Sequence, residues 1–71
     1  MDKKSVLKQV SKNIQKIRKE KGYTQETFAE KMNVSWSYVS KLESGILNLS
    51  LGKIVELANY LETDVKDLLE L

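Results

Sequence analysis

Apolar residues recur at steps of three and four along most of the chain, which is the spacing that places side chains on one face of an α-helix. The first such repeat, interrupted mainly by lysine and glutamine, consists of Val6, Leu7, Val10, Ile14 and Ile17. It predicts a helix over residues 4–21. Gly22 follows this segment, and glycine tolerates the positive φ at which helices commonly end.

Two short helices are predicted in the centre of the chain. Thr24 and Ser35 each precede a helical stretch, where a hydroxyl can accept a hydrogen bond from a free backbone N–H. Gly45 is suited to end the second stretch, so that helix spans 36–44. The few residues between the two helices include Asn33, a residue type that adopts the left-handed conformation more easily than most.

The remaining segment repeats the same pattern. Ser50 can cap a helix over 51–61, whose apolar repeat is Leu51, Ile54, Val55, Ala58 and Leu61. A last short helix is expected to open at Asp64 or Thr63 and to carry Val65, Leu68, Leu69 and Leu71. No segment has the alternation of a strand. The predicted fold is all-α, a compact bundle of five helices.

Composition narrows the classes of function. The 71 residues contain no cysteine and no histidine, which excludes disulfides and thiolate zinc sites and removes the commonest general base. No glycine-rich phosphate loop is present either, so we expect no enzyme, no metal and no cofactor. One domain over residues 1–71 is expected from the length. No run approaches the length of a membrane span, which favours a cytoplasmic protein without a membrane partner.

Positive charge is concentrated at the start of the chain. Residues 1–21 carry a net charge of +6, whereas the whole chain carries +2. This asymmetry is compatible with a polyanionic partner, and equally with a lysine-rich helix face that only meets water.

The central pair of helices is connected as tightly as a helix-turn-helix corner requires, although a generic helical hairpin would share that feature. Beyond this, "IRKEKGYTQETFAEKMNVSWSYVSKLESG" and "NLSLGKIVELANYL" resemble the lambda-repressor and Cro-like helix-turn-helix DNA-binding family. The resemblance covers about Ile14 to Leu69. It implies a regulator that binds double-stranded DNA, with the helix that starts at Trp36 in the major groove. Short chains of this kind resemble phage and plasmid regulators and restriction-modification controllers.

The resemblance assigns base reading to the exposed side and first turn of this helix. The expected base-reading residues are Ser35, Trp36, Ser37, Ser40 and Lys41. Packing in the core is the alternative role for the ring of Trp36. Expected contacts with the DNA backbone are Gln25, Tyr38, Ser44, Asn48 and Ser50. For Tyr38, the ring could lie along the preceding helix while only the hydroxyl reaches a phosphate.

Two charged pairs have counterparts in the family. Arg18 and Glu43 match an ion pair that links the first helix to the end of the third, although they could also be two independent surface charges. Glu26 and Glu30 match acidic positions with which phage-repressor relatives contact RNA polymerase. Solvated helix acids are the alternative for these two residues.

Family members bind pseudo-palindromic operators as dimers, which implies a homodimer here. The chain has apolar residues after Gly45 where many relatives have basic ones. The expected dimer residues are Ile46, Leu49, Leu68, Leu69 and Leu71. Their alternative role is in the core of a single chain. The main alternative function is a protein-interaction module, such as a toxin-neutralising antitoxin, which would favour an exposed apolar groove.

Overall fold

The computed structural model describes residues 1–71 and contains five helices and no strand. The helices are α1 (Lys3–Glu20), α2 (Gln25–Met32), α3 (Trp36–Ser44), α4 (Leu51–Leu61) and α5 (Val65–Leu68). The predicted all-α class and the five predicted helices are confirmed. The bounds of α1 differ by one residue at each end, and α5 stops at Leu68, before the predicted Leu69 and Leu71. None of the helices combines the length and the apolar character that crossing a membrane requires.

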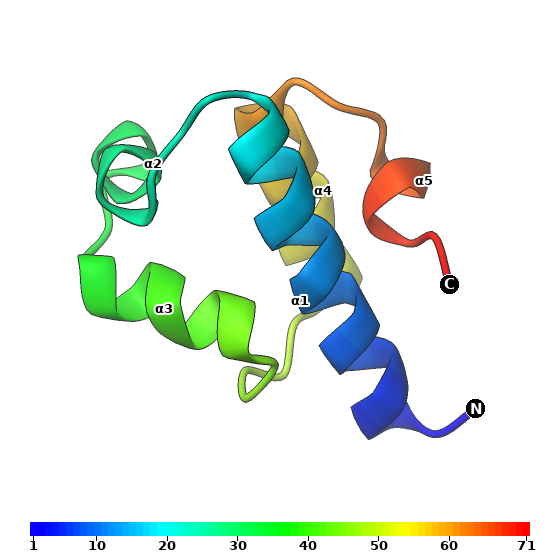
Figure 1. Ribbon diagram of the computed structural model, residues 1–71. Coiled ribbons are helices and arrows are strands. Elements are labelled where there is room, and N and C mark those ends of the chain that lie inside the picture. Colours follow the sequence, from blue (N-terminus) through cyan, green and yellow to red (C-terminus); the bar gives the residue numbers. More distant parts are fainter.

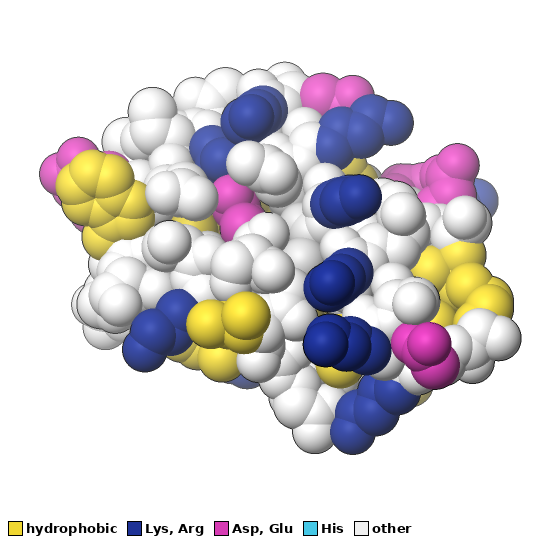
Figure 2. All heavy atoms as spheres, turned by 60° about the horizontal axis from the view of Figure 1, so that its bottom comes forward, with side chains coloured by type: hydrophobic (Ala, Val, Ile, Leu, Met, Phe, Trp, Pro, Cys, Tyr) yellow, Lys and Arg dark blue, Asp and Glu magenta, His cyan; other side chains and the backbone are white.

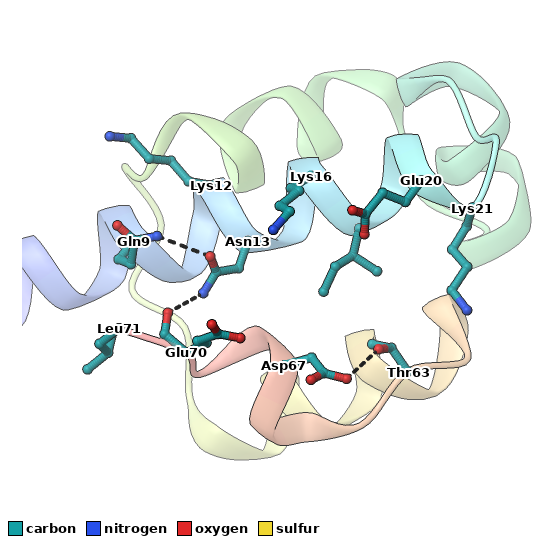
Figure 3. A pocket seen from close by; sticks show the side chains of 11 residues that line it. Gln9, Lys12, Asn13, Lys16, Glu20, Lys21, Thr63, Asp67, Glu70 and Leu71 are labelled. Atoms are coloured by element: carbon teal, nitrogen blue, oxygen red, sulfur yellow. Dashed lines mark hydrogen bonds between the residues drawn. The ribbon is translucent and has the colours of Figure 1, made fainter.

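Each of the first four helices begins at a side-chain cap. Asp2, Thr24, Ser35 and Ser50 accept hydrogen bonds from the backbone N–H three residues later. The predicted caps Thr24, Ser35 and Ser50 are therefore confirmed. Asp64 precedes α5 without such a bond. Beside it, the Thr63 hydroxyl donates to the Asp67 carboxylate at 3.0 Å (Figure 3).

The helices form two groups that share α1. In Figure 1, α2 and α3 make a corner to the left of α1, α4 runs behind α1, and α5 lies to the right and packs against both. All five helices contribute to one apolar core, whose buried members are Val10, Ile14, Ile17, Phe28, Ala29, Met32, Val39, Leu42, Ile54, Leu57, Ala58, Leu61 and Leu68. The core thus fixes the α2–α3 corner against α1.

One part of the predicted apolar repeat is wrong. Leu51 and Val55 of α4 are 64% and 39% exposed, whereas Leu57, which the prediction omitted, is buried. α4 is apolar on most of its circumference, so its sequence allowed more than one buried face. Packing against α1 and α5 selects the face that carries Ile54 and Leu57.

The end of the chain is tied to α1 by Asn13, a residue that no sequence pattern singled out. Its side-chain amide donates to the backbone carbonyls of Leu68 and Glu70 at 3.0 and 2.7 Å, and its oxygen accepts from Gln9 (Figure 3). These bonds hold the segment after α5 beside α1, along a groove between the two helices.

Candidate nucleic-acid interface

The α2–α3 corner has the local geometry of a helix-turn-helix. α2 ends at Asn33, which adopts the left-handed conformation predicted for it, with φ of 58°. The N–H of Val34 then donates to the carbonyl of Ala29 at 3.0 Å, closing the turn. Ala29 is buried, and its small side chain leaves room for the two helices to pack closely.

Beyond its first turn, α3 presents a polar outer side because its aliphatic residues point inward. Val39 and Leu42 are fully buried, whereas Ser37, Ser40 and Lys41 are exposed. The predicted outward orientation of these three residues is confirmed. Figure 2 views the molecule from the side on which α3 lies in Figure 1, and the surface there is mostly polar with a few isolated apolar patches.

The predicted pair of Arg18 and Glu43 is a buried, bidentate ion pair. Arg18 Nε and Nη2 donate to the two carboxylate oxygens at 2.6 and 3.0 Å, and both side chains are almost inaccessible to solvent. A third guanidinium N–H donates to the carbonyl of Tyr23 at 2.7 Å. Arg18 therefore connects α1, the start of the α2 segment and α3 in one fixed arrangement.

Gln25 extends this connection to the outer surface. Its amide nitrogen donates to Glu43 Oε1 at 3.1 Å, and its amide oxygen accepts from the indole N–H of Trp36 at 3.1 Å. The half-buried side chain predicted to clamp a phosphate is thus already bonded within the chain, with one amide N–H left to donate, and its contact with a phosphate stays a prediction. Sequence reasoning missed this network because its members lie 11 and 18 residues apart.

Trp36 is 57% exposed, so the alternative of a core tryptophan is wrong. Because its indole N–H is bonded to Gln25, the exposed part of the ring offers an apolar surface instead of a hydrogen-bond donor. Tyr38 is half-buried against the core, which matches the arrangement in which its ring packs internally.

Several predicted DNA-contacting hydroxyls already have partners within the chain. Ser35 and Ser50 accept the capping bonds of α3 and α4, each at 3.1 Å. The Ser44 hydroxyl donates to the carbonyl of Lys41 at 2.8 Å. All three residues remain exposed, as does Asn48, so contact with a phosphate stays a prediction for each of them.

Three titrating groups have shifted pKa values, and none of them lies on the outer side of α3. The hydrogen bond from the N–H of Ser5 lowers the pKa of Asp2. Hydrogen bonds to Tyr23 and to Glu56 raise the pKa of Lys31 and of Lys53 respectively.

The predicted dimer residues differ in how deeply they are buried. Ile46, Leu69 and Leu71 are exposed, and Leu49 packs partly against the core. Leu68 is 0% exposed, and its assignment to a dimer interface is therefore wrong. It lies in the core of its own chain because α5 packs against both α1 and α4.

Comparisons with known proteins agree with this architecture. A helix-turn-helix family model matches residues 14–68. The chain belongs to this helix-turn-helix family. It has the fold of DNA-binding transcription regulators, and the predicted resemblance is confirmed. No curated protein matches this sequence.

Solved structures of three regulators are similar over nearly the whole helix-turn-helix chain. The restriction-modification controller protein C.AhdI from Aeromonas hydrophila is 32% identical, with a TM-score of 0.82 and coverage of 96% of this chain and 99% of that one. The clp gene regulator ClgR from C. glutamicum is 28% identical, with a TM-score of 0.82 and coverage of 90% and 82%. The DNA-binding domain of BldD is 25% identical, with a TM-score of 0.85 and coverage of 97% and 99%.

Proposed function

We propose that this protein is a sequence-specific regulator of transcription that places α3 in the major groove of double-stranded DNA. The observation that carries the proposal is the outer side of α3, where Ser37, Ser40 and Lys41 are exposed on a helix whose other side is locked into the core. Hydroxyl and ammonium groups can bond base edges or phosphates, and a helix of this width fits the groove.

The network behind α3 supports this proposal. A reading helix must keep its angle to the rest of the protein, and the buried pair of Arg18 and Glu43 fixes α3 to α1. Gln25 orients the Trp36 ring at the first turn of α3. That ring is suited to cover a thymine methyl group or a deoxyribose, since its N–H is already bonded.

Selection from a random library of duplexes tests base reading. We expect Ser40→Ala to weaken binding to the selected sequence by about 1 to 3 kcal/mol and to relax the preference at one base pair. Ser5→Ala, which removes an exposed hydroxyl from α1, is the matched control and should leave the preference unchanged. Fluorescence of Trp36, the only tryptophan, should change as duplex is added. Absence of any selected sequence would overturn the proposal.

The proposed binding form is a homodimer on a pseudo-palindromic operator, because one α3 reads too few base pairs for useful specificity. Ile46, Leu69 and Leu71 remain candidates for the interface, and the exposed Leu51 and Val55, one turn apart on α4, join them. Analytical ultracentrifugation should show that the original protein is a dimer. The Leu51→Glu variant should sediment as a monomer. Val34→Glu, a change at an exposed apolar residue in the α2–α3 turn, should leave the dimer intact.

Activation of transcription is a further part of the proposal. Glu26 and Glu30 are exposed on α2, one turn apart, and neither forms an ion pair. DNA phosphates repel acidic side chains, so Glu26 and Glu30 are unsuited to contact DNA. A contact with RNA polymerase is the role that we propose for them. Glu26→Lys should lower promoter output at unchanged operator occupancy. Unchanged output would leave these residues as solvated helix acids.

The antitoxin alternative is less well supported. Docking of a protein partner favours an exposed apolar groove, but the groove between α1 and α5 has only two hydrophobic residues among its eleven lining residues. The polar outer side of α3 also fits DNA better than an apolar protein surface.

A further inference from the structure

One face of α1 carries a row of exposed lysines at steps of four and three residues, which keeps them on one side of the helix. We call Lys4, Lys8, Lys12, Lys16 and Lys19 the lysine ridge. It lies on the opposite side of α1 from the buried Val10 and Ile14. Figure 2 shows basic side chains aligned in a column on the same face of the molecule as the polar surface.

No lysine of the ridge forms a salt bridge in the protein. The two salt bridges in the structure join Arg18 to Glu43 and Lys53 to Glu56, and no lysine of the ridge takes part in either. Figure 3 shows Lys12 and Lys16 beside the groove that also holds Asp67 and Glu70, yet they form no ion pair across it.

This arrangement destabilises the isolated helix. Like charges four residues apart on a helix repel each other by about 0.2 to 0.5 kcal/mol per pair, and the ridge contains three such pairs between Lys4 and Lys16. An anion that binds along the ridge would remove this repulsion.

The ridge also meets the end of α3. Gly45, which terminates α3, lies so close to α1 that a Cβ on it would be 3.0 Å from Cγ of Lys8. The pair of Arg18 and Glu43 holds the two helices together at the same end of α3. A duplex that lies on the outer side of α3 is therefore brought to the ridge at that end.

The dimensions of the ridge match a nucleic-acid backbone. Four residues of helix rise about 6 Å, so the distance from Lys4 to Lys16 is about 18 Å. One strand of B-form DNA presents a phosphate about every 3.4 Å along the helix axis, so the part of the ridge from Lys4 to Lys16 spans about five base pairs.

We propose that the lysine ridge is a second DNA-contacting surface, which binds the phosphates of the same duplex beside the segment read by α3. This inference rests on the proposed function. The ridge would add affinity without sequence preference, while the exposed residues of α3 supply the preference.

The test compares two triple variants on a labelled random-sequence duplex of about 30 base pairs, because contacts with phosphates do not depend on sequence. Lys8→Gln/Lys12→Gln/Lys16→Gln removes the centre of the ridge. Lys31→Gln/Lys53→Gln/Lys66→Gln removes the same charge from α2, α4 and α5. Fluorescence anisotropy over a range of salt concentrations gives the slope of log K against log salt for each protein, and circular dichroism verifies that each one is folded.

We expect the ridge variant to lower the magnitude of this slope by about 2 to 3, since each lost phosphate contact removes about 0.9. The control variant should keep the slope of the original protein. Equal slopes for the two variants would overturn the ridge proposal and leave the proposed function standing. The same conclusion would follow if the ridge variant lost binding to anionic lipid vesicles while its binding to DNA did not change. If the original protein binds no duplex, both the proposed function and the ridge proposal are overturned.

Discussion

Arg18 and the lysine ridge are basic groups on the same helix, but they lie in opposite environments. Arg18 is buried and donates to both oxygens of Glu43 and to a backbone carbonyl. The ridge lysines are exposed and have no carboxylate within ion-pair distance. The planar guanidinium can satisfy several acceptors at once in a buried site, whereas an ammonium group is strongly hydrated and stays at the surface.

The difference shows that a count of charges does not identify the cations that are available to a partner. Residues 1–21 carry the positive excess of the chain, yet Arg18 is neutralised inside the protein. Its role is to set the position of α3. Only the exposed lysines remain free to meet an anion, so the two kinds of basic residue should respond to substitution in different ways.

The largest expected effect is that of Arg18→Ala on folding. It leaves the buried Glu43 carboxylate with only the Gln25 amide as a partner, which should destabilise the protein by about 3 to 5 kcal/mol. Lys12→Ala should change the free energy of unfolding by about 0.5 kcal/mol or less. Urea unfolding followed by circular dichroism measures both. DNA binding should also fall further for Arg18→Ala than for Lys12→Ala, and equal losses would contradict the positioning role of Arg18.

A smaller effect on stability is expected where Gly45, at the end of α3, contacts Lys8 of the ridge. Gly45 has a φ of 82°, and a Cβ there would approach the Lys8 backbone Cα to 3.3 Å as well as its side chain. Gly45→Ala should therefore destabilise the protein by about 2 kcal/mol or more, from the left-handed conformation and the contact together. Gly22→Ala is the control, because φ is 87° there but nothing lies within 4 Å. If the two variants lose the same amount of thermal stability, then Lys8 does not restrict the residue at position 45.

The sequence was sufficient for the local features and insufficient for several distant ones. Helices and caps follow from neighbouring residues, so the start of α3 at Trp36 and the cap at Ser35 were predictable. The pair of Arg18 and Glu43 was reached through family resemblance, since its members are 25 residues apart. The side-chain hydrogen bonds of Gln25 and Asn13 depend on how the helices pack, so no local sequence pattern predicts them.

The same distinction between local and distant features explains which buried residues were predicted wrongly. Leu68 and Leu69 are adjacent leucines at the end of a short helix, and the chain alone does not say which of them faces inward. Packing of α5 against two helices buries the first and leaves the second at the surface. In α4, apolar residues on most sides made the buried face ambiguous for the same reason.

Lys12→Glu, a change in the middle of the ridge, should change stability and DNA affinity in opposite directions. It converts the repulsive pairs with Lys8 and Lys16 into attractive ones, so α1 should be more stable by up to about 1 kcal/mol. Affinity for random-sequence duplex should nevertheless fall, because a phosphate contact is replaced by a repulsion. Thermal unfolding and anisotropy on the same preparation measure the two effects. A variant that gains stability and keeps its affinity would contradict the ridge proposal.

The smallest expected effect concerns the N-terminus of α1, where an acidic group lies near the ridge. Asp2 accepts the N–H of Ser5 at 2.7 Å, and this bond is the main reason that its pKa lies below the ordinary 3.8, with a smaller contribution from the charge of Lys8. Because the folded pKa is lower than the unfolded one, the cap contributes fully above pH 3.8. Its contribution is lost as pH falls through the folded pKa.

We therefore expect the first turn of α1 to fray in acid while the buried helices persist. Carbon chemical shifts of residues 3–6, followed from about pH 6 to about pH 2, should move toward coil values in the original protein. Asp2→Asn retains a capping oxygen without a titrating carboxyl, and its first turn should not respond to pH in this way. Lys8→Gln should raise the midpoint slightly, since it removes the minor stabilising charge. An unchanged midpoint in that variant would show that Lys8 is too well screened by solvent to act on Asp2, and its charge would then be felt only by a ligand that contacts the ridge directly.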